Sequence, residues 1–178
     1  MSNANLIRAA RAKNDEFYTR LSDIERELER EEYRAFFSGK VVHCNCDDFR
    51  YSQFYRYFAD NFDALNLKKL IVTGYAIDDA RRGWRGTFAV KTSTGVRRGY
   101  LTGNGDFRSA ECIDLLREAD VIVTNPPFSL FREYVALLMR FDKKFAIIGH
   151  ISAVTYKEIF PLIKDNRISR RKILTSLN

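Results

Sequence analysis

The most informative part of this sequence is Ala119-Asp120-Val121-Ile122-Val123-Thr124-Asn125-Pro126-Pro127-Phe128. The β-branched run at 121–123 is typical of a strand buried on both faces of a parallel sheet. The strand must end there, because the two prolines that follow lack N–H donors. Asn125 would then lie at the carboxyl end of the strand, where open α/β sheets bind their ligands.

The residues that follow this strand present a particular chemistry. The Asn125 amide and the Pro126 carbonyl offer acceptors that suit an exocyclic amine, and the Phe128 ring suits a planar base. Pro127 makes the turn stiff, and Ser129 is a candidate N-cap for a following helix. The alternative is a structural strand-to-helix turn whose phenylalanine belongs to the core.

The rest of the chain alternates between strand and helix patterns. Apolar residues at helical spacing, such as Phe54, Phe58 and Phe62, predict helices with one buried face. We expect strands at 41–46, 69–75, 121–123 and 144–149, and helices at 22–37, 52–65, 109–119, 130–141 and 155–163. This alternation predicts an α/β fold with a mostly parallel sheet and helices on both faces. At 178 residues, the chain is long enough for a single domain with a sizeable core.

The composition is that of a basic globular protein. A net charge of +7 favours a polyanionic partner, because basic side chains on phosphates release counterions; a basic surface without such a partner is the alternative. No apolar run is long enough to span a membrane, and the N-terminus lacks a signal-peptide core. The three cysteines do not form a disulfide framework, and Cys44 and Cys46 lack zinc-ligand spacing. We therefore expect a reduced, cytoplasmic protein without a metal site or membrane association.

Residues 81–102 interrupt the alternation of strands and helices. Two β-prone runs, 88–91 and 96–100, flank Thr92-Ser93-Thr94-Gly95, which predicts a β-hairpin. The segment carries the basic residues Arg81, Arg82, Arg85, Lys91, Arg97 and Arg98. It is interpreted either as an edge hairpin protected by charge or as a contact with a nucleic-acid backbone.

At Asn125-Pro126-Pro127-Phe128 the chain resembles the amino-methyltransferases that use S-adenosylmethionine (SAM). An ordered set of motifs makes it most similar to the EcoRI-type adenine-specific DNA methyltransferases. These motifs are Asn14-Asp15-Glu16-Phe17-Tyr18-Thr19, Cys46-Asp47-Asp48, Asn104-Gly105-Asp106-Phe107, Asn125-Pro126-Pro127-Phe128-Ser129 and Lys157-Glu158-Ile159-Phe160-Pro161-Leu162-Ile163. The resemblance runs from about Lys13 to about Asn166.

The resemblance implies a cofactor site built from several loops. It assigns Tyr18 and Thr19 to the methionine end of SAM, Asp47 and Asp48 to its ammonium or ribose, and Asp106 and Phe107 to its adenine. Each assignment has an alternative. Aromatic residues of the first loop could staple a helix to the sheet, Asp48 or Ser52 could cap the helix that follows, and Asp106 could cap the helix at 109–119. No glycine follows the strand at 41–46, although a SAM-binding fold normally has a Gly-rich turn there.

The resemblance also implies a Rossmann-like fold with strand order 3-2-1-4-5, the cofactor over strand 1 and the target over strand 4. The implied reaction is direct in-line methyl transfer to the N6 amine of a flipped-out adenine in DNA, as in restriction-modification. It assigns catalysis to Asn125, Pro126, Pro127 and Phe128, and we assign DNA contact to Arg81, Arg82, Arg85, Arg97 and Arg98. The alternatives are an RNA adenine or a protein glutamine amide as acceptor, and a non-catalytic module or a subunit completed by a partner chain.

The sequence departs from this family after the strand at 144–149. The family fold closes with two further strands and adds a target-recognition region. The basic tail at 167–178 leaves no room for these, so we expect a single catalytic domain over 1–178 without its final strands. The strand at 144–149 would then lie at or near an exposed edge, where a partner chain or a second copy could pair.

Overall fold

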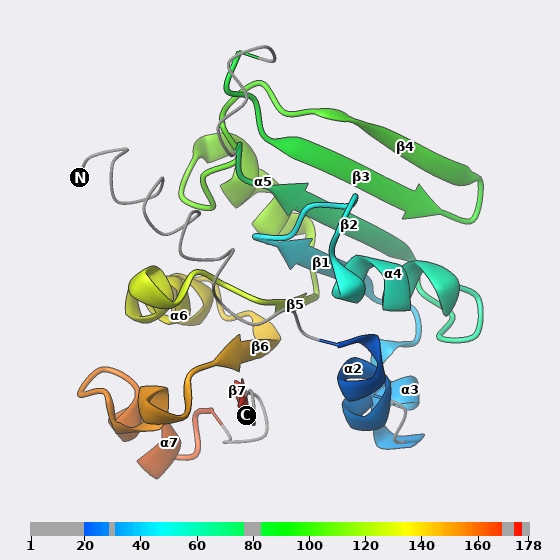
Figure 1. Ribbon diagram of the computed structural model, residues 1–178. Helices are drawn as coiled ribbons and strands as arrows, with labels where there is room; N and C mark the ends of the chain where they lie inside the picture. The colour runs from blue at the N-terminus through cyan, green and yellow to red at the C-terminus, as the bar shows by residue number, and fades with distance from the viewer. Residues whose placement is uncertain (1–19, 29–30, 77–82, 169–172, 176–178) are drawn as a thin grey trace.

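The computed structural model describes residues 20–28, 31–76, 83–168 and 173–175, which form helices around one seven-stranded sheet (Figure 1). The strands are β1 (Val41–Asn45), β2 (Lys69–Gly74), β3 (Thr87–Thr92), β4 (Gly95–Tyr100), β5 (Val121–Thr124), β6 (Lys144–Gly149) and β7 (Ile173–Thr175). The α-helices are α2 (Leu21–Leu28), α3 (Glu31–Phe37), α4 (Gln53–Asp60), α5 (Ala110–Glu118), α6 (Phe131–Arg140) and α7 (Phe160–Lys164). Two 3₁₀ turns are η2 (Phe128–Leu130) and η3 (Ile151–Thr155).

Helices cover both faces of the sheet, as the sequence predicted (Figure 1). Successive strand residues point to opposite faces, so each strand contributes to two cores. Val42 and Cys44 of β1 pack on one face with side chains of α2, α3 and α4. Ile122 of β5 packs on the other face with side chains of α5 and α6. The α/β fold class is therefore confirmed.

The hairpin belongs to the sheet rather than being an addition to it. β3 pairs antiparallel with β2, from Leu70↔Lys91 to Gly74↔Thr87, and β4 pairs antiparallel with β3. The full order is β4-β3-β2-β1-β5-β6-β7, so the expected 3-2-1-4-5 corresponds to β3-β2-β1-β5-β6. The hairpin strand β3 occupies the position of the expected third strand. Its backbone pairs with the N–H and C=O groups of β2 that would otherwise be open.

The expectation that no strand follows β6 was wrong. β7 pairs parallel with β6, with Ile147 opposite Ile173 and Gly149 opposite Thr175. β6 is therefore not an edge strand, and the predicted association at its edge loses its basis. A strand of three residues inside a basic segment carries too little periodicity for a sequence pattern to reveal it.

Several helix ends follow local sequence signals, and one does not. Ser52 and Ser109 cap α4 and α5 by accepting hydrogen bonds from the amides three residues ahead. Ser129 lies inside η2 and does not cap α6, which begins after Leu130 without a side-chain cap. The helix expected at 22–37 is described as α2 and α3, and 29–30 lie outside the described residues. Across the described part of the chain, no helix has both the length and the apolarity needed to cross a membrane.

Candidate active site at the carboxyl edge of the sheet

The carboxyl ends of β1, β2 and β5 bring the predicted site residues to one edge of the sheet. β1 and β5 are neighbours at the point where the chain order reverses, with β2 beyond β1 and β6 beyond β5. Their backbone pairing comprises Val42↔Val121 and His43↔Ile122, so the ladder stops before either strand ends. Open α/β folds bind ligands in the crevice at such a reversal. Tyr18, Thr19, Arg81 and Arg82 lie outside the described residues.

The chain turns sharply after β1 at Cys46, whose φ is 90°. Residues other than glycine rarely adopt positive φ, because the Cβ atom then approaches the backbone. The amides of Cys46 and Asp47 both donate to the carbonyl oxygen of Thr73 on β2, each at 3.0 Å. A cysteine thus adopts the conformation that a glycine would usually supply, and two hydrogen bonds hold it there.

A Gly-rich turn would let backbone segments approach each other closely at this point. Here glycines outside the loop after β1 allow that approach. A Cβ atom on Gly74, the last residue of β2, would lie 3.0 Å from the Asp47 carbonyl oxygen and 3.1 Å from the Asp48 Cα. Gly105 has φ +79°, and a Cβ atom there would overlap the Gly74 carbonyl. Backbone from three loops can therefore pack together at this edge only because these side chains are absent.

The two aspartates after β1 have different surroundings. Asp47 is 6% exposed, and its carboxylate is contacted by the hydroxyl of Thr124 at the end of β5. The side chain of Asp48 is 19% exposed and pairs with Arg50, with Nη2 donating to Oδ2 at 2.6 Å. Burial would raise the pKa of Asp48, but hydrogen bonds from the Arg50 side chain and amide hold it below its usual value. Asp48 therefore presents a carboxylate at the surface of the site, whereas Asp47 lies beneath it.

A buried polar network lies under this loop. The hydroxyl of Tyr134 on α6 donates to the side-chain oxygen of Asn45, and both residues are fully buried. Burial, followed by the nearby acidic groups of Cys46 and Asp47, raises the pKa of Tyr134 well above its usual value. Tyr134 therefore remains a neutral donor, and it joins α6 to the last residue of β1.

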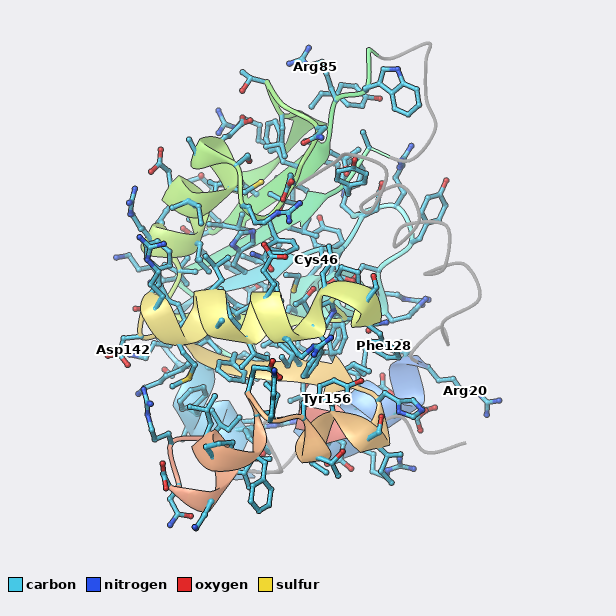
Figure 2. All side chains as sticks on the ribbon, turned by 90° about the vertical axis from the view of Figure 1, so that its left-hand side faces the viewer. Arg20, Cys46, Arg85, Phe128, Asp142 and Tyr156 are labelled. Atoms are coloured by element: carbon cyan, nitrogen blue, oxygen red, sulfur yellow. The ribbon has the colours of Figure 1, made fainter. Side chains whose placement is uncertain are left out.

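The residues after β5 form the second half of the site. Asn125 is 9% exposed and Pro126 is buried, whereas Phe128 is partly exposed. The Phe128 ring meets His150, the residue after β6, edge to face with ring centroids 6.5 Å apart. Figure 2 is viewed toward the carboxyl ends of β1 and β2 and shows Phe128 beside one end of α6. An amide and an aromatic ring thus lie together at one strand end, as predicted.

Asp106 and Phe107 are held by a separate cluster. Arg108 pairs with Asp106 at 2.9 Å and with Glu133 of α6 at 3.1 Å. The Phe107 ring is buried and packs edge to face against Tyr134, with centroids 5.2 Å apart. The ring therefore belongs to the core, and the exposed part of this turn is its polar backbone and the partly buried Asp106 carboxylate.

The described arginines of the hairpin lie at the far end of the sheet from β6. Arg85, at the top of Figure 2, donates to the Leu101 carbonyl at 2.6 Å. Arg97 and Arg98 are both exposed and point to opposite faces of β4. The Arg98 guanidinium lies 5.8 Å above the ring of Phe49, in the loop after β1. Arg85 is exposed as well, so all three arginines are open to a polyanion, and Arg98 borders the predicted cofactor loop.

Exposed aromatic side chains lie near Arg50 and in the hairpin segment. Tyr51 is 65% exposed, and the Arg50 guanidinium lies 5.3 Å from its ring centroid. Trp84, which precedes β3, and Tyr100, the last residue of β4, are also exposed. Aromatic rings interleaved with arginines are typical of surfaces that bind unstacked nucleobases.

Sequence reasoning missed Thr124, Tyr134 and His150. Thr124 and His150 occupy or directly follow the ends of neighbouring parallel strands, a position that could have marked them. Tyr134 gave no such signal, because its role depends on which side of α6 faces β1. Within the described residues, no group of three or more His, Cys, Asp or Glu side chains gathers as a metal site.

The protein therefore has an α/β fold. Its candidate site combines the Asn125 amide after β5 with the buried Asp47 carboxylate after β1. A family model described as "Adenine-specific methyltransferase EcoRI" matches residues 5–176. The chain belongs to this family of adenine-specific methyltransferases.

Curated relatives support the same assignment. The chain is 47% identical to the type II methyltransferase M.EcoRI of Escherichia coli, over 94% of this chain and 55% of that protein. It is 44% identical to M.MpnI of Mycoplasma pneumoniae, over 90% of this chain and 48% of that protein. It is 41% identical to M.MgeORF184P of Mycoplasma genitalium, over 90% of this chain and 49% of that protein. The chain thus spans about half the length of these relatives, and no solved structure matches it significantly.

Proposed function

We propose that this chain catalyses SAM-dependent methyl transfer to the N6 amine of adenine in DNA. One observation carries the proposal: the motif that begins at Asn125 is adjacent, through Thr124, to the carboxylate of Asp47 in the loop after β1. The two strand ends that would hold the acceptor amine and the methyl donor are therefore parts of one site. A role in restriction-modification, in a reduced cytoplasm, belongs to the same proposal.

The loop after β1 fits an extended cofactor that carries an ammonium group and a ribose. Because Gly74 has no side chain, the backbone of Asp47 and Asp48 can pack against the end of β2. The partly exposed Asp48 carboxylate would accept hydrogen bonds from an ammonium or a ribose hydroxyl. Asp106 would meet the adenine end through its carboxylate, and Phe107 through its backbone, because its ring is buried. Tyr18 and Thr19 would complete the methionine end, and bound SAM would supply an electrophilic methyl group.

The residues after β5 would activate the acceptor. The lone pair of an aromatic amine is delocalised into the ring, so the N6 nitrogen is a weak nucleophile. Hydrogen bonds from this amine to the Asn125 side-chain oxygen and the Pro126 carbonyl would make the nitrogen more tetrahedral and direct its lone pair. Pro127 fixes the turn, and Phe128 would stack on the base. As the new N–C bond forms, the bond between that carbon and the SAM sulfur would break, the sulfur would leave as an uncharged thioether, and the amine proton would pass to solvent.

Adenine inside a duplex is out of reach, so the base must rotate out of the stack. The exposed arginines of β4 are four strand spacings from β5, or roughly 19 Å, which is within the footprint of a short duplex. Arg97 and Arg98, with Arg85 and the undescribed Arg81 and Arg82, would contact phosphates beside the target.

The test incubates the chain with methyl-labelled SAM and an adenine-containing duplex, and then measures label at N6. Asn125→Ala serves as the inactive control, and Ser129→Ala, which changes an exposed neighbour, serves as the active one. We expect labelled N6-methyladenine with the unsubstituted chain and with Ser129→Ala. Absence of label under every condition, with SAM binding intact, would refute turnover by this chain.

The same assay with RNA and with protein as acceptors separates the other activities. Label that follows RNA adenine or a glutamine amide instead of DNA would overturn the choice of acceptor. Binding of SAM without transfer, restored by a second chain, would instead show that this chain works as one subunit.

A further inference from the structure

The hydroxyl of Thr124 joins the two halves of the proposed site. Thr124 is the last residue of β5 and directly precedes Asn125. Its side chain is fully buried, and its Oγ1 atom lies 2.7 Å from the Asn45 carbonyl oxygen. The same hydroxyl contacts the Asp47 carboxylate. The Thr124 side chain on β5 therefore contacts both the last residue of β1 and the loop that follows β1.

This contact lies beyond the backbone pairing of the two strands. The last registered pair between β1 and β5 is His43↔Ile122, so Thr124 and Asn45 are two residues past it. Among the described residues, no registered pair joins the last two of β1 to the last two of β5. The Thr124 side chain supplies a direct polar link between the cofactor loop and the strand that leads into the motif.

The chemistry of the link favours positioning over catalysis. A hydroxyl has one proton, so Thr124 can donate to only one of its two acceptors at a time. Asp47 is almost completely buried, so its carboxylate depends on such neighbours for its orientation. Any movement of Thr124 would be passed to Asp47 and, through the backbone, to Asn125.

We infer that Thr124 is a positioning residue that sets the Asp47–Asp48 loop and Asn125 at a fixed separation, so that cofactor and acceptor amine meet in line. This inference rests on the proposed function. It assigns Asp47 a supporting role through Thr124 and leaves Asp48 as the carboxylate that meets the cofactor. An error of about 1 Å in such an alignment can lower a rate about 100-fold.

Two substitutions separate the hydroxyl from the methyl group. Thr124→Val keeps the shape and removes the hydrogen bonds, whereas Thr124→Ser keeps the hydroxyl and removes a buried methyl. We expect Thr124→Val to weaken SAM roughly 10-fold or more, the effect of losing a hydrogen bond to a charged group, and to lower kcat as well. Thr124→Ser should restore SAM affinity and kcat to within about threefold, even if its packing defect makes it the less stable variant. Calorimetry with SAM and steady-state kinetics on the full chain give the two readouts.

A double-mutant cycle with Asp47→Asn tests the link itself. If Thr124 acts through Asp47, the double variant should bind SAM about as weakly as the weaker single variant. Folded Thr124→Val protein with unchanged SAM affinity and kcat, or effects that multiply fully in the cycle, would overturn the positioning role alone. An unsubstituted chain that binds no SAM would overturn the proposed function, and the positioning role with it.

Discussion

Gly74 lies so close beneath Asp47 that a Cβ atom on it would be 3.0 Å from the Asp47 carbonyl oxygen. Gly74 is the last residue of β2, whereas Asp47 lies in the loop after β1, and the same Cβ atom would be 2.7 Å from the Thr87 hydroxyl. The loop after β1 therefore has the close backbone approach of a Gly-rich turn, although the glycine lies on the neighbouring strand.

Gly74→Ala should displace the cofactor loop. We expect the free energy of unfolding to fall by roughly 1–3 kcal/mol, the usual cost of overpacking, and SAM to bind more weakly. Urea denaturation and calorimetry measure the two effects. Gly103→Ala is the matched control, because its Cβ atom would have its nearest neighbour, Glu111, at 3.9 Å. Equal effects of the two substitutions would contradict this account of the loop.

Asn125→Ala should remove the acceptor that activates the amine and leave the cofactor loop intact. By analogy with deletion of one oxyanion-hole donor, we expect a loss of about 3 kcal/mol of transition-state stabilisation. SAM affinity should change little. Phe128→Ala should behave similarly, through loss of base stacking worth about 1–3 kcal/mol. Single-turnover methylation and SAM binding, measured on the same samples, separate the two effects.

Replacement of both aspartates should have the reverse effect. Asp47→Ala with Asp48→Ala removes the Asp48 acceptor and the Asp47 carboxylate that supports the loop, so SAM should bind more weakly by roughly 1.5–3 kcal/mol or more. Calorimetric titration detects this even without turnover. The map of the site is wrong if this variant binds SAM normally while folded Asn125→Ala does not bind it.

His43 should make stability depend on pH. Burial, with a smaller contribution from the charge of Lys143, lowers the pKa of His43 to about 3. An unfolded histidine has a pKa near 6.5, so between about pH 6.5 and pH 3 the unfolded chain binds a proton that the folded chain does not. We expect this group to remove roughly 2 kcal/mol of unfolding free energy between pH 7.5 and pH 5.

Urea denaturation at the two pH values measures the change. His43→Gln keeps a hydrogen-bonding group opposite Thr73, which contacts the His43 Nε2 atom at 3.0 Å, and should lose this contribution to the pH dependence. His150→Gln changes the exposed histidine and should retain the contribution of His43. A pH dependence that survives unchanged in His43→Gln would show that another group causes it.

The exposed arginines of β4 should contribute to DNA affinity through phosphates. Arg97→Gln with Arg98→Gln should weaken binding of unrelated duplexes to a similar extent and reduce the salt slope by about 1 for each lost phosphate contact. Fluorescence anisotropy over a range of salt concentrations measures the slope. Arg117→Gln is the control, because Arg117 is an exposed arginine in the last turn of α5, a helix that packs against β1. An unchanged slope in the double variant would remove β4 from the DNA surface.

Features that depend on a few neighbouring residues were predictable from the sequence. The buried β-branched strand and its end at the two prolines follow from side-chain shape and missing donors. The caps at Ser52 and Ser109 follow from hydrogen bonds that span three residues. Asn125 and Phe128 were likewise found at a strand end, because strand and turn are both local.

Features that depend on the packing of distant segments were decided by the tertiary structure. Thr124 meets Asp47 across 77 residues and Tyr134 meets Asn45 across 89, so no spacing in the sequence indicates either contact. The positive φ of Cys46 is held by the Thr73 carbonyl, and its loop is accommodated by Gly74 on another strand. The hairpin takes the third place in the sheet and β7 closes it beyond β6, because open strand edges select their partners only when the sheet assembles.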